Sequence, residues 1–273
     1  MFSNYFPLNI QDVDNQIFEF IKVSKKDKTL ILQLARPLKK NALSPQMVNE
    51  IAFAVQFAQQ SPSVWNLVLK AEGSIFCAGA DLKAFAGASD ESLSTIPPPE
   101  KEVLLGELFK NLSKPSIAIV HADAMAGAML LLCGCTYVVA ADTVKFHLPE
   151  VKRGLFPFQV LASLMDVMPH RRALDWCIRG NAISAQEALS YGLATHVTDL
   201  NELEATAERI IEELSQNSPS AIAAGLETYI HLQQNGTSNQ HPYLMQQLME
   251  CLGTPNAQEG LQAFMEKRMP VWK

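Results

Sequence analysis

The residues best placed to do chemistry are two small-residue turns and one carboxylate. Ala78-Gly79-Ala80 and Ala126-Gly127-Ala128 each lead into a segment of helical character, and Glu150 follows the apolar Leu148-Pro149. The first amides of a helix lack an internal partner, and small side chains let a ligand approach the main chain. Such turns can offer N–H groups to an oxygen that gains negative charge. A carboxylate beside apolar residues has a raised pKa, which suits proton transfer.

The stretch from Pro115 to Glu150 is expected to hold the second turn and the carboxylate in place. Its apolar segments predict a strand, a buried helix and two further strands, at Ser116–Val120, Met129–Cys135, Tyr137–Ala140 and Val144–His147. Its uncharged run, Ala124–Ala141, has the length of a membrane span. However, it contains glycine, cysteine, threonine and tyrosine, and no cluster of Lys or Arg flanks it. We therefore expect a buried helix and strand, and no membrane partner.

The residues before this stretch predict strands paired with helices. Alternating apolar residues across four charged ones indicate a hairpin, and Ser44-Pro45 is typical of a helix start. A segment rich in Ser, Ala, Gly and Pro predicts a loop. The expected elements are the hairpin strands Ile17–Val23 and Thr29–Leu34, a helix from Pro45 to near Gln60, a strand at Trp65–Lys70, the loop Gly87–Pro99 and an amphipathic helix at Glu100–Leu112.

The residues after Glu150 turn progressively helical. Ser184-Ala185-Gln186-Glu187 has the pattern of a capping box, and Gly192 is well placed to end that helix. From residue 201 onward every segment predicts a helix. The sequence therefore predicts an α/β fold, with an α/β core over residues 1–198 and a helical region over residues 199–273. The other expected elements are helices at Val160–Met168, Arg171–Arg179, Asn201–Gln216, Ser220–Gln234, Pro242–Leu252 and Asn256–Lys267, and a strand at His196–Val197.

Composition excludes several classes of protein. The chain has 273 residues, 48% of them hydrophobic, and a net charge of −6, which argues against a nucleic-acid partner. Its five cysteines are odd in number and sit mostly in apolar runs, as expected of reduced thiols rather than a disulfide framework. Cys133 and Cys135 lack a matching second pair, so we expect no metal site. The N-terminal residues lack the features of a signal peptide, and a cytoplasmic location is predicted.

Several stretches together resemble the crotonase, or enoyl-CoA hydratase/isomerase, family. They occur in that family's order and spacing from about residue 17 to the C-terminus. The resemblance implies a spiral of ββα units, with a helical C-terminal region that mediates trimerisation, and a trimer or a dimer of trimers. The matching pieces are Arg36-Pro37 with Asn41-Ala42-Leu43, Phe76 through Lys83, Val120 through Gly127, Leu148-Pro149-Glu150 with Gly154 through Pro157, Gly180 with Ile183 through Ala188 and Gly192-Leu193, and Glu259 through Arg268.

The resemblance also implies an acyl-CoA thioester as substrate, with no separate cofactor, since coenzyme A is part of the substrate. By position, the backbone amides of Ala80 and Gly127 would form an oxyanion hole for the thioester carbonyl, and Glu150 would be the general acid/base. Coenzyme A would contact the backbone around Ala78 to Leu82 and several basic residues. Taken singly, each basic residue is better explained as an ordinary solvated surface charge. The implied coenzyme A contacts are Lys39, Lys40, Ala78, Asp81, Leu82, Lys83, Lys267 and Arg268.

One departure from the family pattern leaves the reaction open. Hydratases of the family carry a second glutamate at the position that is Leu130 here, and leucine neither orients nor deprotonates a water. The residues therefore allow an enoyl-CoA hydratase or isomerase that uses Glu150 alone. They equally allow an acyl-CoA-binding protein that has lost its chemistry, or a decarboxylase or hydrolase of CoA thioesters.

Overall fold

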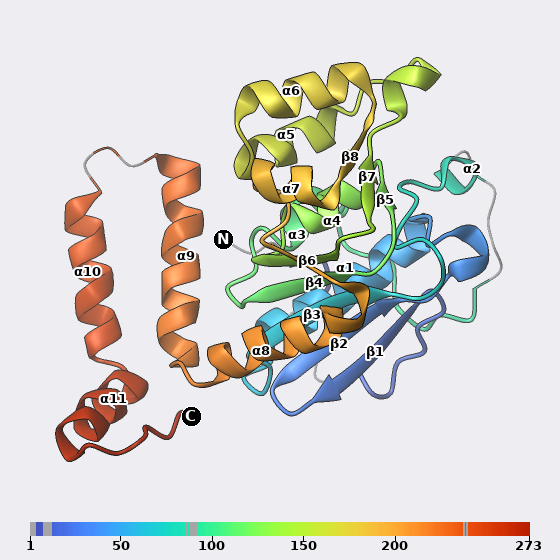
Figure 1. The fold of residues 1–273 in the computed structure, drawn as a ribbon. Helices are drawn as coiled ribbons and strands as arrows, with labels where there is room; N and C mark the ends of the chain where they lie inside the picture. Colours follow the sequence, from blue (N-terminus) through green and yellow to red (C-terminus); the bar gives the residue numbers. More distant parts are fainter. Residues whose placement is uncertain (1–3, 8–12, 86, 88–91, 237, 239) are drawn as a thin grey trace.

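A six-stranded sheet forms the centre of the α/β core (Figure 1). A computed structural model describes residues 4–7, 13–85, 87, 92–236, 238 and 240–273. The strand order is β1-β2-β3-β4-β6-β9, and all neighbours pair in parallel except the β1–β2 hairpin. Its strands are β1 (Ile21–Lys26), β2 (Thr29–Leu34), β3 (Asn66–Ala71), β4 (Ser116–Val120), β6 (Tyr137–Ala141) and β9 (His196–Thr198).

A second, smaller sheet lies beside the first and carries the segments that lead to the candidate site. It has the order β5-β7-β8, with β5 and β7 parallel and β7 and β8 antiparallel. Its short strands are β5 (Ala124–Met125), β7 (Lys145–His147) and β8 (Ala182–Ser184).

Helices cover the sheets in the order that the sequence predicts, with one exception. The side chain of Ser44 accepts a hydrogen bond from the Met47 amide at the start of α1, and the capping box at Ser184 is present with Gly192 at the end of α7. The helices of the core are α1 (Pro45–Gln60), α2 (Leu82–Phe85), α3 (Leu105–Leu108), α4 (Ala128–Leu132), α5 (Phe158–Val167), α6 (His170–Arg179) and α7 (Ala185–Tyr191), with 3-10 turns η1 (Pro37–Lys39), η2 (Glu150–Arg153) and η3 (Leu200–Glu202).

The predicted helix over Glu100–Leu112 is wrong, because only the single turn α3 forms there. The Glu100 amide donates a hydrogen bond to the Tyr5 carbonyl at 2.8 Å, and Leu104 is extended. Tertiary contacts thus override an amphipathic pattern. The predicted loop at Gly87–Pro99 has no helix or strand at residues 87 and 92–99, and its residues 88–91 lie outside the described residues.

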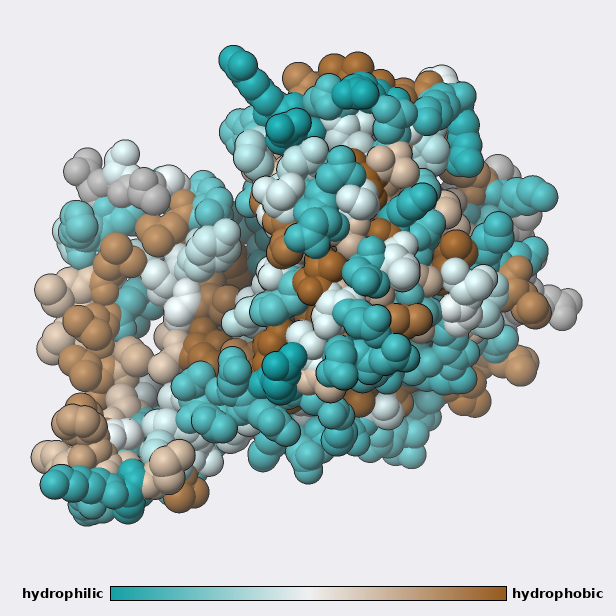
Figure 2. All heavy atoms as spheres, in the orientation of Figure 1, coloured by the Kyte–Doolittle hydropathy of each residue, from teal (hydrophilic) through white to brown (hydrophobic). Residues whose placement is uncertain are grey.

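The C-terminal helices confirm the predicted helical region. They are α8 (Leu203–Ser215), α9 (Pro219–Asn235), α10 (His241–Leu252) and α11 (Pro255–Glu266). Helix α8 packs on β4 and β6, whereas α9 to α11 extend away from the sheets (Figure 1). Figure 2 shows apolar atoms gathered along α10, where Met245, Leu248, Met249 and Leu252 are exposed. Among the described residues, no helix is both long and apolar enough to cross a membrane.

Candidate active site

Three parallel chain segments deliver the three predicted site groups to one edge of the small sheet. Ala124 pairs in parallel with Cys77 on one side and with Phe146 on the other, so these residues form one row. Ala80 and Gly127 each follow the row by three residues, and Glu150 follows it by four. The carboxyl ends of parallel strands meet at the same edge of a sheet, where ligands commonly bind. The structure therefore places Gly127 next to Ala80, where a Cβ atom on Gly127 would lie 3.5 Å from the Ala80 nitrogen, and Glu150 follows the third segment at the same edge.

The amides of Ala80 and Gly127 are available to a ligand. Leu43 pairs with Ala80 through the carbonyl of Gly79 and the amide of Asp81, at 2.8 and 2.9 Å. Successive backbone groups of a strand point to opposite sides, so the Ala80 amide points away from Leu43. Among the described residues, neither the Ala80 amide nor the Gly127 amide donates a hydrogen bond. Two unpaired donors at adjoining turns have the chemistry to stabilise an oxygen atom that gains negative charge.

The two turns hold each other in position through close backbone contact. Gly79 has φ +86°, and a Cβ atom there would lie 2.7 Å from the Ala126 Cβ and 3.0 Å from the Gly127 amide nitrogen. Ala126 itself has φ +53°, an uncommon left-handed conformation for a residue other than glycine. The amides of Met125 and Ala126 are bonded to the carbonyls of Cys77 and His147, both at 2.8 Å. The Gly127 amide is thereby fixed beside the first turn.

Buried polar groups stabilise the first turn, Ala78-Gly79-Ala80, from inside the protein. The Arg36 guanidinium pairs with the Asp81 carboxylate at 2.7 Å, donates to the Ala42 carbonyl at 2.9 Å and lies over the Phe20 ring. The hydrogen bond from Arg36 holds the pKa of Asp81 below its ordinary value. Asp81, predicted as a coenzyme A contact, thus has its amide and its carboxylate engaged inside the protein.

Asn41 is the fully buried clamp of the same region. Its side-chain oxygen accepts from the Arg36 amide at 2.8 Å, and its side-chain nitrogen donates to the carbonyls of Glu72, Ile75 and Phe76 at 2.8 to 3.1 Å. Asn41 also has φ +51°, which asparagine tolerates better than most residues. The chain before and after the Ala78-Gly79-Ala80 turn is therefore tied to one side chain.

We expect Asn41→Ala to lower the free energy of unfolding by about 3 kcal/mol or more, because it leaves buried backbone groups unpaired at a left-handed position. Urea unfolding at fixed protein concentration measures this. Lys40→Ala is the matched control, since Lys40 has φ +53° but an exposed side chain. An Asn41→Ala protein as stable as Lys40→Ala would contradict the clamp.

Glu150 begins the turn η2 and is half-buried. Its Oε2 is fully buried, and no described residue donates a hydrogen bond to that atom. Burial raises the pKa of Glu150, and the residue's own amide and Arg153 offset part of this increase. Cys177 on α6 lies near Glu150. Burial of the Cys177 thiol, together with the negative charge of Glu150, raises the pKa of that thiol to about 11. This carboxyl group therefore holds a proton more strongly than an exposed glutamate does.

A cavity of about 710 Å³ opens in front of the two free amides. Ala80, Gly127 and Leu130 contribute to its wall, as do the start of α1, the extended segment before α3 and one face of α5. Glu150 is not among the residues that line it. Near the amides the wall is apolar, through Leu43, Val48 and Leu130. The cavity thus offers space for an acyl group beside the amides.

The predicted coenzyme A contacts fall into two groups that one chain does not bring together. Lys39, Lys40, Leu82 and Lys83 are exposed near the first turn, and the Ala78 amide is bonded to the Lys40 carbonyl. Lys267 and Arg268 lie at the end of α11, at the opposite end of the molecule from α2 (Figure 1).

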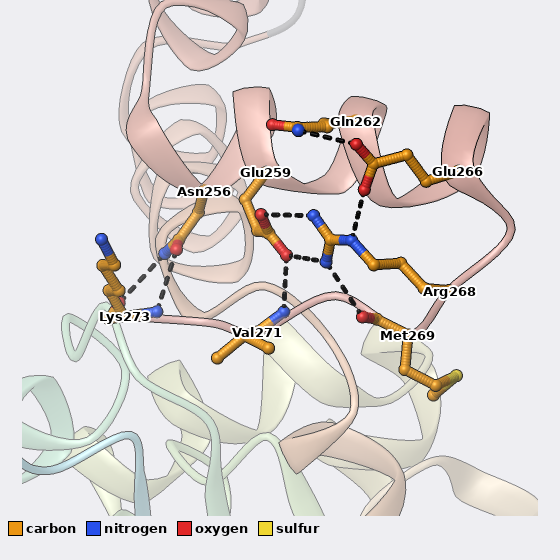
Figure 3. Close-up of polar contacts among 8 residues, drawn as sticks. All are labelled: Asn256, Glu259, Gln262, Glu266, Arg268, Met269, Val271 and Lys273. Carbon is orange, nitrogen blue, oxygen red and sulfur yellow. Dashed lines mark hydrogen bonds and ion pairs between the residues drawn. The ribbon is translucent and has the colours of Figure 1, made fainter.

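Arg268 is also occupied by carboxylates. Its guanidinium pairs with Glu259 at 2.5 Å and with Glu266 at 2.6 Å (Figure 3). Hydrogen bonds from Arg268 and from the Val271 amide lower the pKa of Glu259 to about 2. Within a single chain this arginine therefore holds the C-terminal segment against α11.

Sequence reasoning missed the residues that shape the far part of the cavity. Gln159, Ser163 and Asp166 lie on one face of α5, and Lys110 pairs with Asp166 at 2.7 Å. In the sequence these residues look like the ordinary polar face of amphipathic segments. The nearest available signal was their spacing, which places them on one side of a helix.

Comparisons with known proteins agree with this geometry. A model described as enoyl-CoA hydratase/isomerase matches residues 25–273. The chain is 32% identical over 240 residues to enoyl-CoA hydratase domain-containing protein 3, mitochondrial, of Rattus norvegicus, covering 88% of this chain and 79% of the relative. It is 30% identical over 250 residues to mevalonyl-coenzyme A hydratase sidH of Aspergillus fumigatus, covering 89% and 91%.

Solved structures show the same likeness. A probable enoyl-CoA hydratase/isomerase from Mycobacterium abscessus superposes with a TM-score of 0.85 at 25% identity, covering 94% of this chain and 99% of that one. Human enoyl Coenzyme A hydratase domain-containing protein 3 gives 0.81 at 27% identity, covering 93% and 100%. The fold predicted from the sequence is therefore confirmed.

Proposed function

The chain belongs to the enoyl-CoA hydratase/isomerase, or crotonase, family, and from this premise we propose that it catalyses proton transfer on an enoyl-CoA thioester. The observation that carries the proposal is the pair of free amides, Ala80 and Gly127, which line the cavity, while Glu150 follows the neighbouring strand at the same edge of the small sheet. Two such donors suit a thioester oxygen that becomes negative, and a carboxylate with a raised pKa suits the proton.

The proposed steps need only these three groups. The thioester oxygen accepts hydrogen bonds from the Ala80 and Gly127 amides. Glu150 removes a proton from C2 of a 3-enoyl thioester, and the electron pair moves into a dienolate held by the two amides. The same carboxyl group then returns the proton to C4, which leaves the 2-enoyl product. Because Glu150 does not line the cavity, we expect its side chain to turn toward the substrate on binding.

Leu130 decides between isomerisation and hydration in this proposal. It lines the cavity and is only 8% exposed, so an apolar side chain stands where family hydratases have their second carboxylate. Hydration needs a group that holds and deprotonates water, whereas a 1,3-proton shift needs one acid/base. We therefore favour the isomerase reaction over the hydratase reaction.

The test supplies the purified protein with crotonyl-CoA and, separately, with a 3-enoyl-CoA, and follows the absorbance of the conjugated thioester. Gain of absorbance from the 3-enoyl ester without loss from crotonyl-CoA is the expected result. Hydration of crotonyl-CoA would show that another group replaces the missing glutamate. If neither ester reacts, the proton-transfer proposal fails.

A second candidate function is binding of acyl-CoA without chemistry. Two observations favour it: Leu130 is in the cavity wall, and Glu150, whose Oε2 is buried, is not among the residues that line the cavity. Calorimetry with a saturated acyl-CoA separates the candidates, because a binding protein would bind the ester and turn over neither enoyl substrate.

Assembly and location complete the proposal. The exposed apolar stripe on α10, Met245, Leu248, Met249 and Leu252, suits contact with other copies of the chain, and we propose a trimer or a dimer of trimers. Sedimentation equilibrium would measure the mass. The cytoplasmic location stays a prediction, because the rat relative carries a mitochondrial name.

A further inference from the structure

One face of α5 contributes polar side chains to the wall of the cavity. Gln159, Ala162, Ser163 and Asp166 follow the spacing of a single helix face, and all of them line the cavity. The ion pair between Lys110 and Asp166 lies in the same wall. A plain hydrocarbon chain in this space would displace water from the polar groups without replacing the hydrogen bonds that the water made.

Ser163 is the buried member of this face. It is 8% exposed, and among the described residues its hydroxyl has no hydrogen-bond partner. A helical serine usually bonds the carbonyl of the preceding turn when no other partner is near, and no such bond forms in the described chain. The Ser163 Oγ is not one of the fully buried unpaired atoms, so it is accessible from the cavity that Ser163 lines. In this position the hydroxyl can hydrogen-bond to a ligand or to a water molecule.

The position of Gly106 shows that the Ser163 hydroxyl is close to Leu130, which lies beyond the proposed oxyanion hole in the cavity wall. A Cβ atom on Gly106 would lie 3.0 Å from the Ser163 Oγ and 3.4 Å from the Leu130 Cδ2. Leu130 stands about 4.5 Å of helix rise beyond Gly127. Leu130 and Ser163 therefore border the same spot, and an acyl group that leaves the hole along Leu130 meets the hydroxyl.

We infer that the acyl group of the natural thioester carries an oxygen, as a hydroxyl or a carbonyl, which hydrogen-bonds to the side chain of Ser163. This inference rests on the proposed function, because it assigns the substrate class of the same site. Ser163 is a specificity-determining residue in it, since it contacts the acyl group away from the reacting carbons.

The experiment compares the dissociation constants of three thioesters with the same number of carbons: hexanoyl-CoA, 6-hydroxyhexanoyl-CoA and 5-oxohexanoyl-CoA. Saturated esters report binding without turnover. We expect at least one oxygenated ester to bind about fivefold more tightly than hexanoyl-CoA, as one neutral hydrogen bond provides. This ratio should fall to about one in Ser163→Ala.

Ser163→Cys separates the hydrogen bond from the loss of volume, because it keeps the size of the side chain and hydrogen-bonds weakly. The ratio should fall in this variant too. Equal binding of all three esters by the parent protein would overturn the inference and leave the proposed function intact, and so would a preference that survives in Ser163→Ala. Failure of every ester to bind would overturn both.

Discussion

Replacing Gly127 by alanine should leave the protein folded and lower kcat/KM for an enoyl-CoA thioester by about a hundredfold or more. Gly127 has φ −56°, which alanine adopts freely, and an added Cβ would make only ordinary contacts, the nearest at 3.5 Å from the Ala80 nitrogen. The new methyl group would nevertheless stand in front of the Gly79–Ala80 peptide, in the space that the thioester oxygen needs.

Two other glycines provide the controls. Gly225→Ala, in α9 with nothing within 4 Å of its Cβ position, should keep full activity and be slightly more stable. Gly79→Ala should lose stability, because of its φ of +86° and the Ala126 Cβ at 2.7 Å. Thermal unfolding and initial rates are measured for all three variants. Full activity of Gly127→Ala would contradict the proposed oxyanion hole.

Glu150→Gln should abolish turnover, with a loss of about a thousandfold or more, while acyl-CoA binding persists. Glutamine keeps the shape of the side chain but accepts no proton from carbon. In the parent protein kcat/KM should rise with pH through a pKa above that of an ordinary glutamate, since burial raises the pKa of Glu150. Initial rates across pH and calorimetry with hexanoyl-CoA measure these effects.

The same variant should change stability in a pH-dependent way. Because the folded state raises the pKa of Glu150, it holds the proton more strongly than the unfolded chain. The free energy of unfolding therefore falls as pH rises from the ordinary glutamate value through the raised one. Glu150→Gln lacks this loss, so its melting temperature should exceed that of the parent near neutral pH and not at pH values below the ordinary pKa.

Glu212→Gln, an exposed carboxylate on α8, is the matched control and should alter neither property. A Glu150→Gln enzyme that retains turnover would assign the proton transfer to another residue. If the difference in melting temperature between Glu150→Gln and the parent protein were the same at all pH values, the stability change would not come from ionisation of Glu150.

The sequence was enough to predict the elements that carry local signals. Ser44-Pro45 and the capping box at Ser184 each determine their own conformation within a few residues, and both are present. The hairpin is also present, but its first strand begins at Ile21, whereas the sequence predicted a start at Ile17. The ordered motifs also predicted that Ala80, Gly127 and Glu150 would share a site. The parallel row of Cys77, Ala124 and Phe146 leads to all three, and the shared site stays a prediction.

What remained out of reach depends on contacts between distant segments. Residues 100–104 have a helical pattern but form no helix: the Glu100 amide is bonded to the Tyr5 carbonyl, and Leu104 is extended. The Asn41 side chain donates hydrogen bonds to carbonyls more than thirty residues further along the chain, and no local sequence pattern predicts such partners. The unpaired hydroxyl of Ser163 lies beside Gly106, which is on another segment of the chain.

Because the row that aligns Cys77, Ala124 and Phe146 joins segments far apart in the sequence, we expect the site to form late in folding. The two-residue strand β5 has little stability of its own, and its partners come from remote parts of the chain, whose loops must close first. A partly folded chain would therefore have helices and a core but no paired amides. A bound thioester would then protect the protein from proteolysis only after the whole structure has formed. A thioester present during synthesis would stabilise only the chains that have completed folding.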